Sequence, residues 1–337
     1  MLIKASGCLR FSKGGFFRTL TQAMKFPQGV QVRMKGARIV KSGRGAWRVL
    51  SWTRPWRGVV PAGLAASVAL LVAGSAAWAE SEPVWVLPEN GCTRLTFNEA
   101  RFVVCHYDAR RYRVRLWLDD DRGETFGSLR RLESWLQARG GRLLLAMNGG
   151  MFTPEYRPAG LYIEQGREIK SINLRRGRGN FHLMPNGVFW VRGSRAGVME
   201  SRRFARLYRR GRLKPDFATQ SGPMLVIDGR LHPRFRSGSD SRKIRNGVGV
   251  RRARGRPGGH DVFFALSLDP VNFHTFARLF RDVLRTPDAL FLDGSVSRLR
   301  TPELSIGGLF GGGIGPIIGV SEGKDAMEGA QSGKAGK

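Results

Sequence analysis

The stretch Leu143-Leu-Leu-Ala-Met-Asn148-Gly-Gly-Met-Phe152 has a counterpart in Ala289-Leu-Phe-Leu-Asp293-Gly-Ser-Val-Ser297. In each, a run of apolar residues stops at a polar residue that is followed by glycine. An apolar run of this length is typical of a strand buried on both faces, and the residue at its end emerges at the rim of the sheet, where ligand sites gather. Glycine at that point lets a ligand approach the backbone closely. The alternative is that the polar residue only closes a turn by bonding to its own backbone. Asn148, Gly149 and Asp293 are therefore candidate site residues.

Two more segments carry candidate polar residues. In Phe217-Ala-Thr-Gln-Ser221-Gly-Pro-Met224, the serine lacks the G-x-S-x-G pattern and has no evident histidine partner, so a serine hydrolase is only weakly indicated. Downstream, a polar loop over residues 237–244 leads to Arg245 and Asn246 at the start of a glycine-containing strand. The planar guanidinium of arginine suits phosphate oxygens and keeps its charge at any working pH.

The periodicity of the chain predicts an α+β fold, or an irregular mixed α/β fold, in a single domain. Strands are expected at residues 102–107, 112–118, 143–147, 246–252, 261–268, 289–292 and 315–320. Helices are expected at residues 128–139, at residues 201–210 and over the apolar face Phe273, Phe276, Ala277, Phe280 and Leu284. Hairpin turns are expected at Gln165-Gly166, Asn186-Gly187 and Asp228-Gly229. Because no regular alternation of strand and helix appears, we expect mixed β-sheets with several hairpins and two or three packed helices.

The N-terminal part has the composition of a targeting segment. Residues 1–58 hold 13 of the 57 Lys and Arg residues and no Asp or Glu, so +18 of the net charge of +31 belongs to the rest of the chain. Residues 59–79 are uncharged and end in Ala77-Trp-Ala79, which matches a secretory signal with a cleavage site before Glu80. The stretch is also long enough for an uncleaved membrane anchor, and Met24 or Met34 is an alternative start. We expect a basic extension with a signal peptide or anchor over residues 1–79, a domain over 80–320, and a disordered tail over 321–337.

If the domain is exported to the periplasm or beyond, its two cysteines are expected to form a disulfide. Cys92 and Cys105 lie early in the exported part, where thiols oxidise, and a disulfide between them would join two early strands or a strand and its preceding loop. Two buried free thiols are the alternative.

Composition and spacing also bear on partners and cofactors. The basic residues occur in scattered pairs without an aromatic-basic repeat, so we expect no nucleic-acid partner and interpret them as a solvated surface facing an anionic envelope. The five histidines show no zinc-binding spacing, so no cofactor is expected, although a bound divalent cation is left open. Membrane contact is expected only through the N-terminal segment, and the oligomeric state is open.

Five ordered motifs resemble those of the phosphodiester glycosidase family, the family of the N-acetylglucosamine-1-phosphodiester alpha-N-acetylglucosaminidases, and most closely its short bacterial envelope branch. These motifs are Met147-Asn-Gly-Gly-Met-Phe152 with Pro158-Ala-Gly-Leu161, Gly179-Asn-Phe181 with Pro185-Asn-Gly-Val188, Gln220-Ser-Gly-Pro-Met224, Arg245-Asn-Gly-Val-Gly249 and Leu292-Asp-Gly-Ser295. They span roughly residues 95–320. One departure is that Asp293-Gly-Ser-Val-Ser297 lacks the longer glycine run of the N-acetylglucosaminidase type, which leaves the substrate open.

The resemblance implies an exported hydrolase that cleaves the glycosidic bond to phosphate in a sugar phosphodiester or an envelope or exopolysaccharide glycan. It implies that Arg245 binds the phosphate and that Asp293 acts at the anomeric carbon as base or nucleophile. Substrate contacts are expected from Asn148, Gly149, Ser221, Asn246 and Ser295. Two alternatives are a non-catalytic envelope protein that binds anionic polysaccharide, and a phosphodiesterase that cleaves the P–O bond. The second alternative usually requires a metal.

Overall fold

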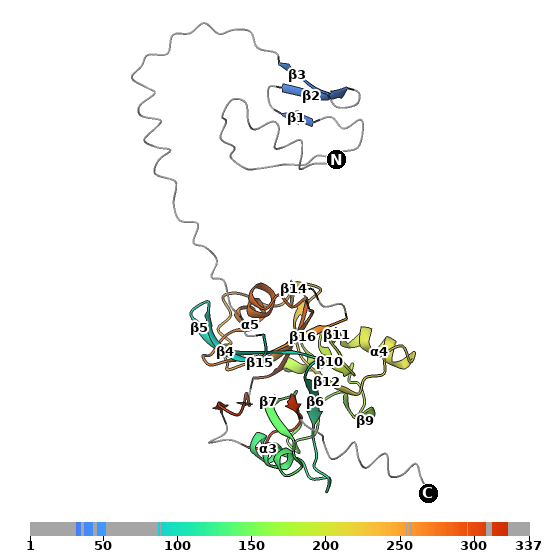
Figure 1. The fold of residues 1–337 in the computed structure, drawn as a ribbon, viewed down its shortest axis with the longest axis vertical. Helices are drawn as coiled ribbons and strands as arrows, with labels where there is room; N and C mark the ends of the chain where they lie inside the picture. The colour runs from blue at the N-terminus through green and yellow to red at the C-terminus, as the bar shows by residue number, and fades with distance from the viewer. Residues whose placement is uncertain are drawn as a thin grey trace. The chain divides into compact units, whose positions relative to one another are not determined.

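The computed structural model describes residues 32–34, 37–42, 46–51, 87, 89–253, 255, 258–294, 296–307 and 312–322 (Figure 1). The chain divides into two compact units, Met1–Glu82 and Pro83–Lys337. Of the expected features, the apolar stretch 59–79, residues 323–337 of the tail and Ser295 lie outside the described residues. No helix within the described residues is long and apolar enough to cross a membrane.

The first unit contains three short strands that the sequence analysis did not predict. They are β1 (Val32–Met34), β2 (Ala37–Ser42) and β3 (Ala46–Ser51). They pair in the order β1-β2-β3, with antiparallel registers throughout.

Three sheets build the second unit. The largest has seven strands in the order β14-β13-β17-β15-β16-β5-β4. In chain order these are β4 (Gly91–Phe97), β5 (Ala100–Asp108), β13 (Met224–Ile227), β14 (Arg230–Leu231), β15 (Asn246–Arg252), β16 (His260–Ser267) and β17 (Asp288–Asp293).

The other two sheets of this unit have five strands each, in the orders β19-β18-β7-β20-β6 and β11-β10-β12-β8-β9. The first comprises β6 (Arg113–Trp117), β7 (Arg142–Asn148), β18 (Leu299–Arg300), β19 (Ser305–Ile306) and β20 (Ile317–Glu322). The second comprises β8 (Tyr162–Glu164), β9 (Arg167–Lys170), β10 (Gly187–Arg192), β11 (Arg195–Glu200) and β12 (Phe217–Ser221).

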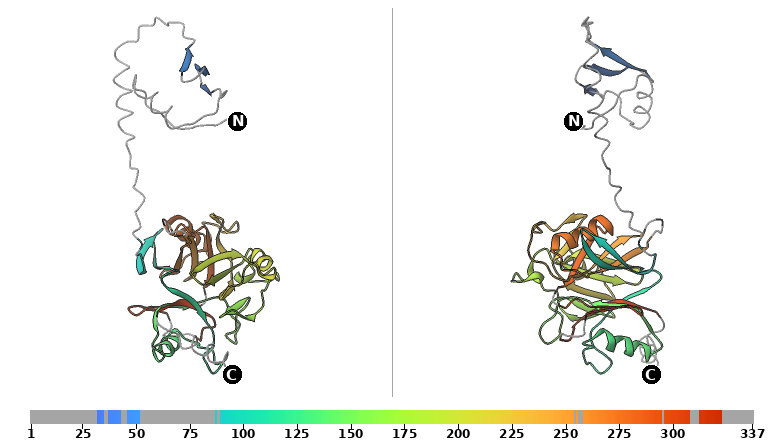
Figure 2. Two further views of the ribbon diagram at one scale, coloured as in Figure 1. Left: turned by 45° about the vertical axis from the view of Figure 1, so that its right-hand side comes forward. Right: turned by 90° about the vertical axis from the view of Figure 1, so that its left-hand side faces the viewer.

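Helices lie on the outside of these sheets, on different sides of the unit (Figures 1 and 2). They are α3 (Leu129–Gln137), α4 (Ser201–Arg209) and α5 (Phe273–Arg278), with a π-helical turn at Leu279–Val283 and a 3-10 turn at Asn180–His182. α3 matches its prediction closely. Ser128 caps its N-terminus by accepting from the Arg131 N–H, and its leucines are buried as their spacing indicated.

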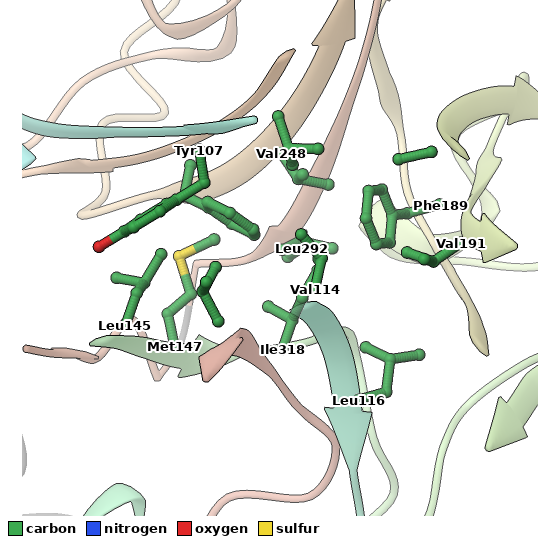
Figure 3. Packing of buried hydrophobic residues seen from close by; sticks show 14 of the residues in the cluster. Tyr107, Val114, Leu116, Leu145, Met147, Phe189, Val191, Val248, Leu292 and Ile318 are labelled. Atoms are coloured by element: carbon green, nitrogen blue, oxygen red, sulfur yellow. The ribbon is translucent and has the colours of Figure 1, made fainter. Parts of the chain in front are cut away.

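The three sheets meet at one hydrophobic core. Figure 3 shows this core lined by Val248 and Leu292 of the seven-stranded sheet, by Leu116, Leu145, Met147 and Ile318 of β6, β7 and β20, and by Phe189 and Val191 of β10. A second cluster lies on the opposite face of the seven-stranded sheet, where the side chains of Phe276 and Phe280 cover it. The seven-stranded sheet is thus buried on both faces, which explains the continuous apolar run that ends at Asp293.

The fold prediction was right in part. The second unit is mainly β-sheet with three α-helices among its described residues, so the α+β label holds only roughly. The sheets are not mixed, because every strand pairing in the described residues is antiparallel. The C-terminal strand also continues through Ser321 and Glu322, two residues that were expected to begin the tail.

Two of the three predicted hairpins are confirmed. Gln165-Gly166 and Asp228-Gly229 each have positive φ at both residues and connect paired antiparallel strands, as the type I′ turn requires. The prediction for Asn186-Gly187 was wrong. Asn186 instead donates from Nδ2 to the Phe181 carbonyl at 2.9 Å, and Gly187 begins β10.

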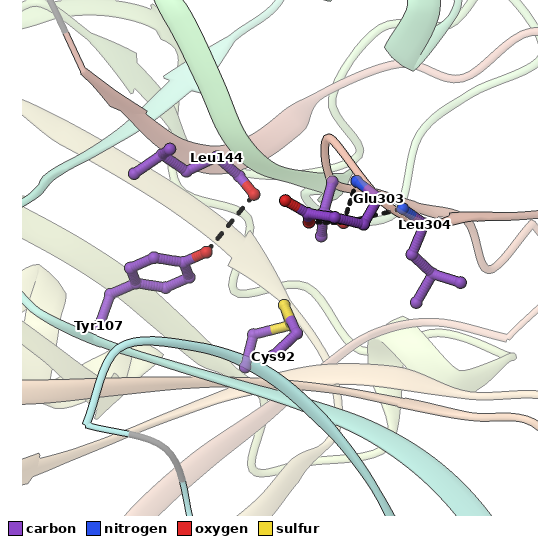
Figure 4. Close-up of a disulfide and its surroundings, with 7 residues drawn as sticks. Cys92, Tyr107, Leu144, Glu303 and Leu304 are labelled. Carbon is purple, nitrogen blue, oxygen red and sulfur yellow. Dashed lines mark hydrogen bonds between the residues drawn. A yellow bond between two sulfur atoms is a disulfide. The ribbon is translucent and has the colours of Figure 1, made fainter.

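The expected disulfide between Cys92 and Cys105 is present (Figure 4). The two residues are register partners on the antiparallel strands β4 and β5, so the bond joins two early strands as predicted.

Candidate functional site

The candidate residues come from strand ends of all three sheets. Within the seven-stranded sheet, β15 begins at Asn246 and its antiparallel neighbour β17 ends at Asp293, and these two residues are register partners. Asn148 ends β7, and Ser221 ends β12. The residues before two of these ends, Met147 and Leu292, point into the core that joins the sheets (Figure 3).

Asn246 links two of the strand ends through its side-chain amide. Its Nδ2 donates to the Asn148 carbonyl at 3.0 Å and to Asn148 Oδ1 at 2.9 Å. Its Oδ1 accepts from the Asp293 N–H at 2.9 Å. Both asparagines are fully buried and Asp293 is 6% exposed, so these bonds form where water does not compete and they fix the three residues relative to one another.

Asn148 retains unused hydrogen-bonding capacity. Its Oδ1 also accepts from the Arg298 N–H at 3.0 Å, but its Nδ2 is buried without a partner. Buried donors without a partner are rare, because leaving one unpaired costs about 1–3 kcal/mol. A substrate oxygen would satisfy this donor.

Hydroxyl groups of β12 hold the adjoining backbone. Ser221 Oγ donates to the Leu292 carbonyl at 2.9 Å, and Thr219 Oγ1 donates to the Gly149 carbonyl at 2.9 Å. Both hydroxyls are buried. Ser221 therefore lies beside the residue that precedes Asp293, and its hydroxyl proton is used in the bond to the Leu292 carbonyl.

Arg245 directly precedes β15, and its side chain points to the opposite face of the sheet from that of Asn246. Val248 and Val250 face the core between the sheets, while a Cβ on Gly249 would meet Phe280 at 2.7 Å, on the α5 side. Consistent with this alternation, the Arg245 guanidinium lies 3.7 Å above the Phe273 ring and 5.4 Å from that of Phe291. Arg245 thus directly precedes Asn246, the register partner of Asp293, but its side chain points to the opposite face from the asparagine pair.

The guanidinium of Arg245 is a buried cation. The side chain is 1% exposed, Nε donates to the Val271 carbonyl and Nη2 to the Ser241 carbonyl, each at 2.8 Å, and Nη1 is buried without a partner. Burial lowers the pKa of Arg245 to about 10, and no carboxylate among the described residues offsets this effect. A buried cation with an unused N–H group is suited to an anionic ligand.

Packing alone accounts for one predicted contact residue. A Cβ on Gly149 would lie 2.7 Å from the Ile318 N, so glycine is required there by the closeness of β20. The predicted Ser295 lies outside the described residues.

Sequence reasoning missed three residues that shape the site. Thr219 and Arg298 contact the Asn148-Gly149 segment, and Phe273 supports Arg245. The helical spacing at Phe273 indicated only a packed face, and nothing in the local sequence singled out Thr219 or Arg298.

The described residues contain no group of three or more His, Cys, Asp or Glu side chains arranged to hold a metal ion.

Comparison with known proteins gave a family match and several similar proteins, among them the following. Residues 141–300 match the family described as NAGPA, phosphodiester glycosidase. The chain is 37% identical over 187 residues to the Escherichia coli (strain K12) protein named Uncharacterized protein YigE, over 56% of this chain and 69% of that protein.

Two solved structures are similar to the chain at low identity. The catalytic domain of zebrafish N-acetylglucosamine-1-phosphodiester alpha-N-acetylglucosaminidase, auto-inhibited by its pro-peptide, has a TM-score of 0.46 and 15% identity, over 72% of this chain and 85% of that one. A hypothetical protein from Synechocystis has a TM-score of 0.43 and 13% identity, over 68% and 61%.

Proposed function

Because the chain belongs to the phosphodiester glycosidase family, we propose that it hydrolyses the glycosidic bond to phosphate in a sugar phosphodiester. The observation that supports this proposal is that two buried charged residues belong to adjoining backbone positions: Asp293 is the register partner of Asn246, and Arg245 directly precedes Asn246. Each has hydrogen-bonding neighbours that fix its backbone, and Asn148 adds an unpartnered donor.

The chemistry assigns one role to each charged residue. Glycoside cleavage passes through an oxocarbenium-like transition state and usually uses two carboxylates. A phosphate monoester leaves as an anion of low basicity, so a strong general acid is less necessary. One carboxylate at the anomeric carbon and one cation at the departing phosphate are sufficient.

In the proposed reaction, water supplies the hydroxyl that forms the new bond to the anomeric carbon while the bond from that carbon to the phosphate oxygen breaks. Asp293 takes the proton of the water, or attacks first as nucleophile and is then released by water. The phosphate monoester leaves against Arg245, whose Nη1 offers it an N–H group. Because Nη1 is buried, the groups that cover it must move when the phosphate binds.

Asn148 and Ser221 have supporting roles in this proposal. Asn148 Nδ2 would donate to a sugar or phosphate oxygen, and the Ser221 hydroxyl keeps the Leu292 carbonyl, and with it the Asp293 backbone, in place. Holding the reacting groups in position contributes a large part of an enzymatic rate.

Export of the domain is a further part of the proposal. It is supported by the basic segment with the apolar stretch 59–79 and by the disulfide between Cys92 and Cys105, since such bonds persist in oxidising compartments. Alkaline phosphatase fused after residue 85 should be active in bacterial cells, because it folds only when exported. An inactive fusion that is made in full would exclude export.

The catalytic roles are tested with the full-length protein and an N-acetylglucosamine 1-phosphodiester as the first probe. Free sugar should be released by the wild type, and the rate should fall at least about 10²-fold in Arg245→Gln and in Asp293→Asn. Matched controls lie at the far ends of β15, which follows Arg245, and of β17, which ends at Asp293. Arg251→Gln also removes an arginine stacked on a phenylalanine, and Asp288→Asn also removes a carboxylate of β17; both should retain activity.

The products separate the proposal from its alternatives. Sugar phosphate in place of free sugar would indicate a phosphodiesterase. Binding of anionic polysaccharide without any turnover would indicate a non-catalytic envelope protein.

A further inference from the structure

Helix α4 carries a stripe of arginines along its exposed side. Its members are Arg202, Arg203, Arg206, Arg209 and the capping residue Arg210, and all five are exposed. At 3.6 residues per turn they fall within an arc of about 120°. We call this set the α4 arginine stripe.

The other side of the helix is packed, so the arginines have one accessible face in common. Phe204 and Ala205 are buried, and Phe204 belongs to a core cluster with Val188 and Ala218 of β10 and β12. The excess of cations continues past the helix with the exposed Arg212 and Lys214, and residues 201–214 include no Asp or Glu.

The stripe is destabilising for the isolated helix. Arg206 lies three or four residues from Arg202, Arg203 and Arg209, and like charges at these spacings repel each other. Arg202 and Arg203 also lie in the first turn, where the helix dipole disfavours cations. Glu200 caps this end through two backbone N–H groups. No described carboxylate lies within ion-pair distance of the stripe's guanidinium groups, although the charge of Arg203 acts on the Asp288 carboxylate at longer range. An anionic partner would relieve this repulsion.

The helix begins next to the candidate site. Ser201 Oγ accepts from Gln220 Nε2 at 3.2 Å, and Gln220 directly precedes Ser221. The element that carries the stripe therefore starts one side-chain contact away from the strand that ends at Ser221. From there the nine residues of α4 extend for about 13 Å at 1.5 Å per residue.

We propose that the α4 arginine stripe is a binding surface for the chain of a polyanionic glycan linked by phosphodiester groups, which it holds beside the catalytic site. Planar guanidinium groups suit repeating phosphates, because each can form two parallel hydrogen bonds to one phosphate. The choice of a glycan, over other polyanions, rests on the proposed function.

The experiment measures binding of a fluorescently labelled phosphomannan to the full-length protein at low ionic strength. The variant Arg202→Gln/Arg206→Gln/Arg209→Gln should bind about tenfold more weakly than the wild type, since each exposed ionic contact contributes modestly. The difference should shrink as salt is added. The variant should unfold at the wild-type temperature or slightly above it, because repulsion within the helix is reduced.

The matched control is Arg110→Gln/Arg111→Gln/Arg130→Gln, which removes the same charge from exposed positions outside α4. Equal loss of binding in both triple variants would show a general effect of net charge and overturn the proposal, as would unchanged binding in the α4 variant. Vesicles of phosphatidylglycerol and phosphatidylcholine form a second arm. Binding to the vesicles that depends on the stripe, without binding to phosphomannan, would replace the glycan with a membrane surface.

Hydrolysis of the small N-acetylglucosamine diester distinguishes failure of this inference from failure of the proposed function. The α4 variant should hydrolyse it at the wild-type rate, since a single diester is too short to use the stripe. If the wild type itself does not hydrolyse it, the proposed function fails while the binding result stands by itself.

Discussion

Asn246 is the position where substitution should report most clearly on the geometry of the site. The variant Asn246→Asp keeps the shape of the side chain but turns the donor Nδ2 into an oxygen. In the folded protein this oxygen would lie about 3 Å from the Asn148 carbonyl and from Asn148 Oδ1, both of which are acceptors. A protonated carboxyl can still donate one bond there, whereas an ionised one cannot.

The size of the effect follows from the burial of Asn246, which is 0% exposed. An ionised carboxylate facing two oxygens in a buried site has a raised pKa, because both desolvation and the neighbouring dipoles disfavour its charge. A group whose folded pKa is raised contributes stability that is present below its unfolded pKa, about 3.9 for Asp, and is lost as the pH rises through the folded pKa. We expect Asn246→Asp to cost about 1 kcal/mol at pH 4 and more than 3 kcal/mol at pH 8.

The assay is urea denaturation of wild type and variant at each pH, followed by tryptophan fluorescence, with the difference in unfolding free energy as the readout. Asn246→Ala serves as the comparison. It removes all three side-chain bonds without adding a titratable group, so its cost should be about 3 kcal/mol and independent of pH. A cost of Asn246→Asp that does not grow between pH 4 and pH 8 would refute the hydrogen-bond directions assigned to this residue.

Three further predictions concern the surroundings of the site. Burial raises the pKa of Glu164 to about 7, so the folded protein holds a proton that the unfolded chain releases, and this contribution of about 3 kcal/mol to stability is lost as the pH rises from 4.5 through 7. In urea denaturation, Glu164→Gln should therefore match the wild type at pH 4 and be more stable than the wild type at pH 8. Parallel pH profiles of the two proteins would contradict the raised pKa. Cys92→Ser/Cys105→Ser should lower the unfolding free energy by about 3 kcal/mol, because the disulfide closes a loop with a sequence separation of 13; a reductant should have the same effect on the wild type and none on the variant. Gly222→Ala should destabilise the protein by about 1–3 kcal/mol, because the added Cβ would lie 2.6 Å from the Cβ of Asn186. Gly238→Ala is the control and should be neutral, because the space around Gly238 is open. Equal thermal transition temperatures for the two variants would contradict the close packing at Gly222.

Local sequence patterns predicted helices and hairpins well where the spacing of apolar residues or a pair of turn residues is enough to specify the element. The leucine spacing predicted α3 to within two residues at each end, and the paired turn residues predicted two hairpins. Asn186-Gly187 has the same turn composition but a different role, because the Asn186 side chain bonds to Phe181. A dipeptide pattern carries no information about that partner.

The contacts within the site depend on residues far apart in the chain. Asn148 and Asn246 bond across 98 positions, and Arg298 reaches Asn148 across 150. The sequence indicated that Asn148 ends a buried strand, but the partner of its side chain follows only from the way the sheets pack. In the same way, Arg245 was selected for its charge, and its burial over Phe273 depends on α5 lying across the sheet.

The position of the cleaved bond tests the central claim most directly. The full-length protein would hydrolyse a sugar phosphodiester in water enriched in ¹⁸O, and mass spectrometry would locate the label in the products. Attack at the anomeric carbon places ¹⁸O in the anomeric hydroxyl of the released sugar and leaves the phosphate unlabelled. Label in the phosphate would mean that water attacks phosphorus, and it would contradict the role of Asp293 at the anomeric carbon.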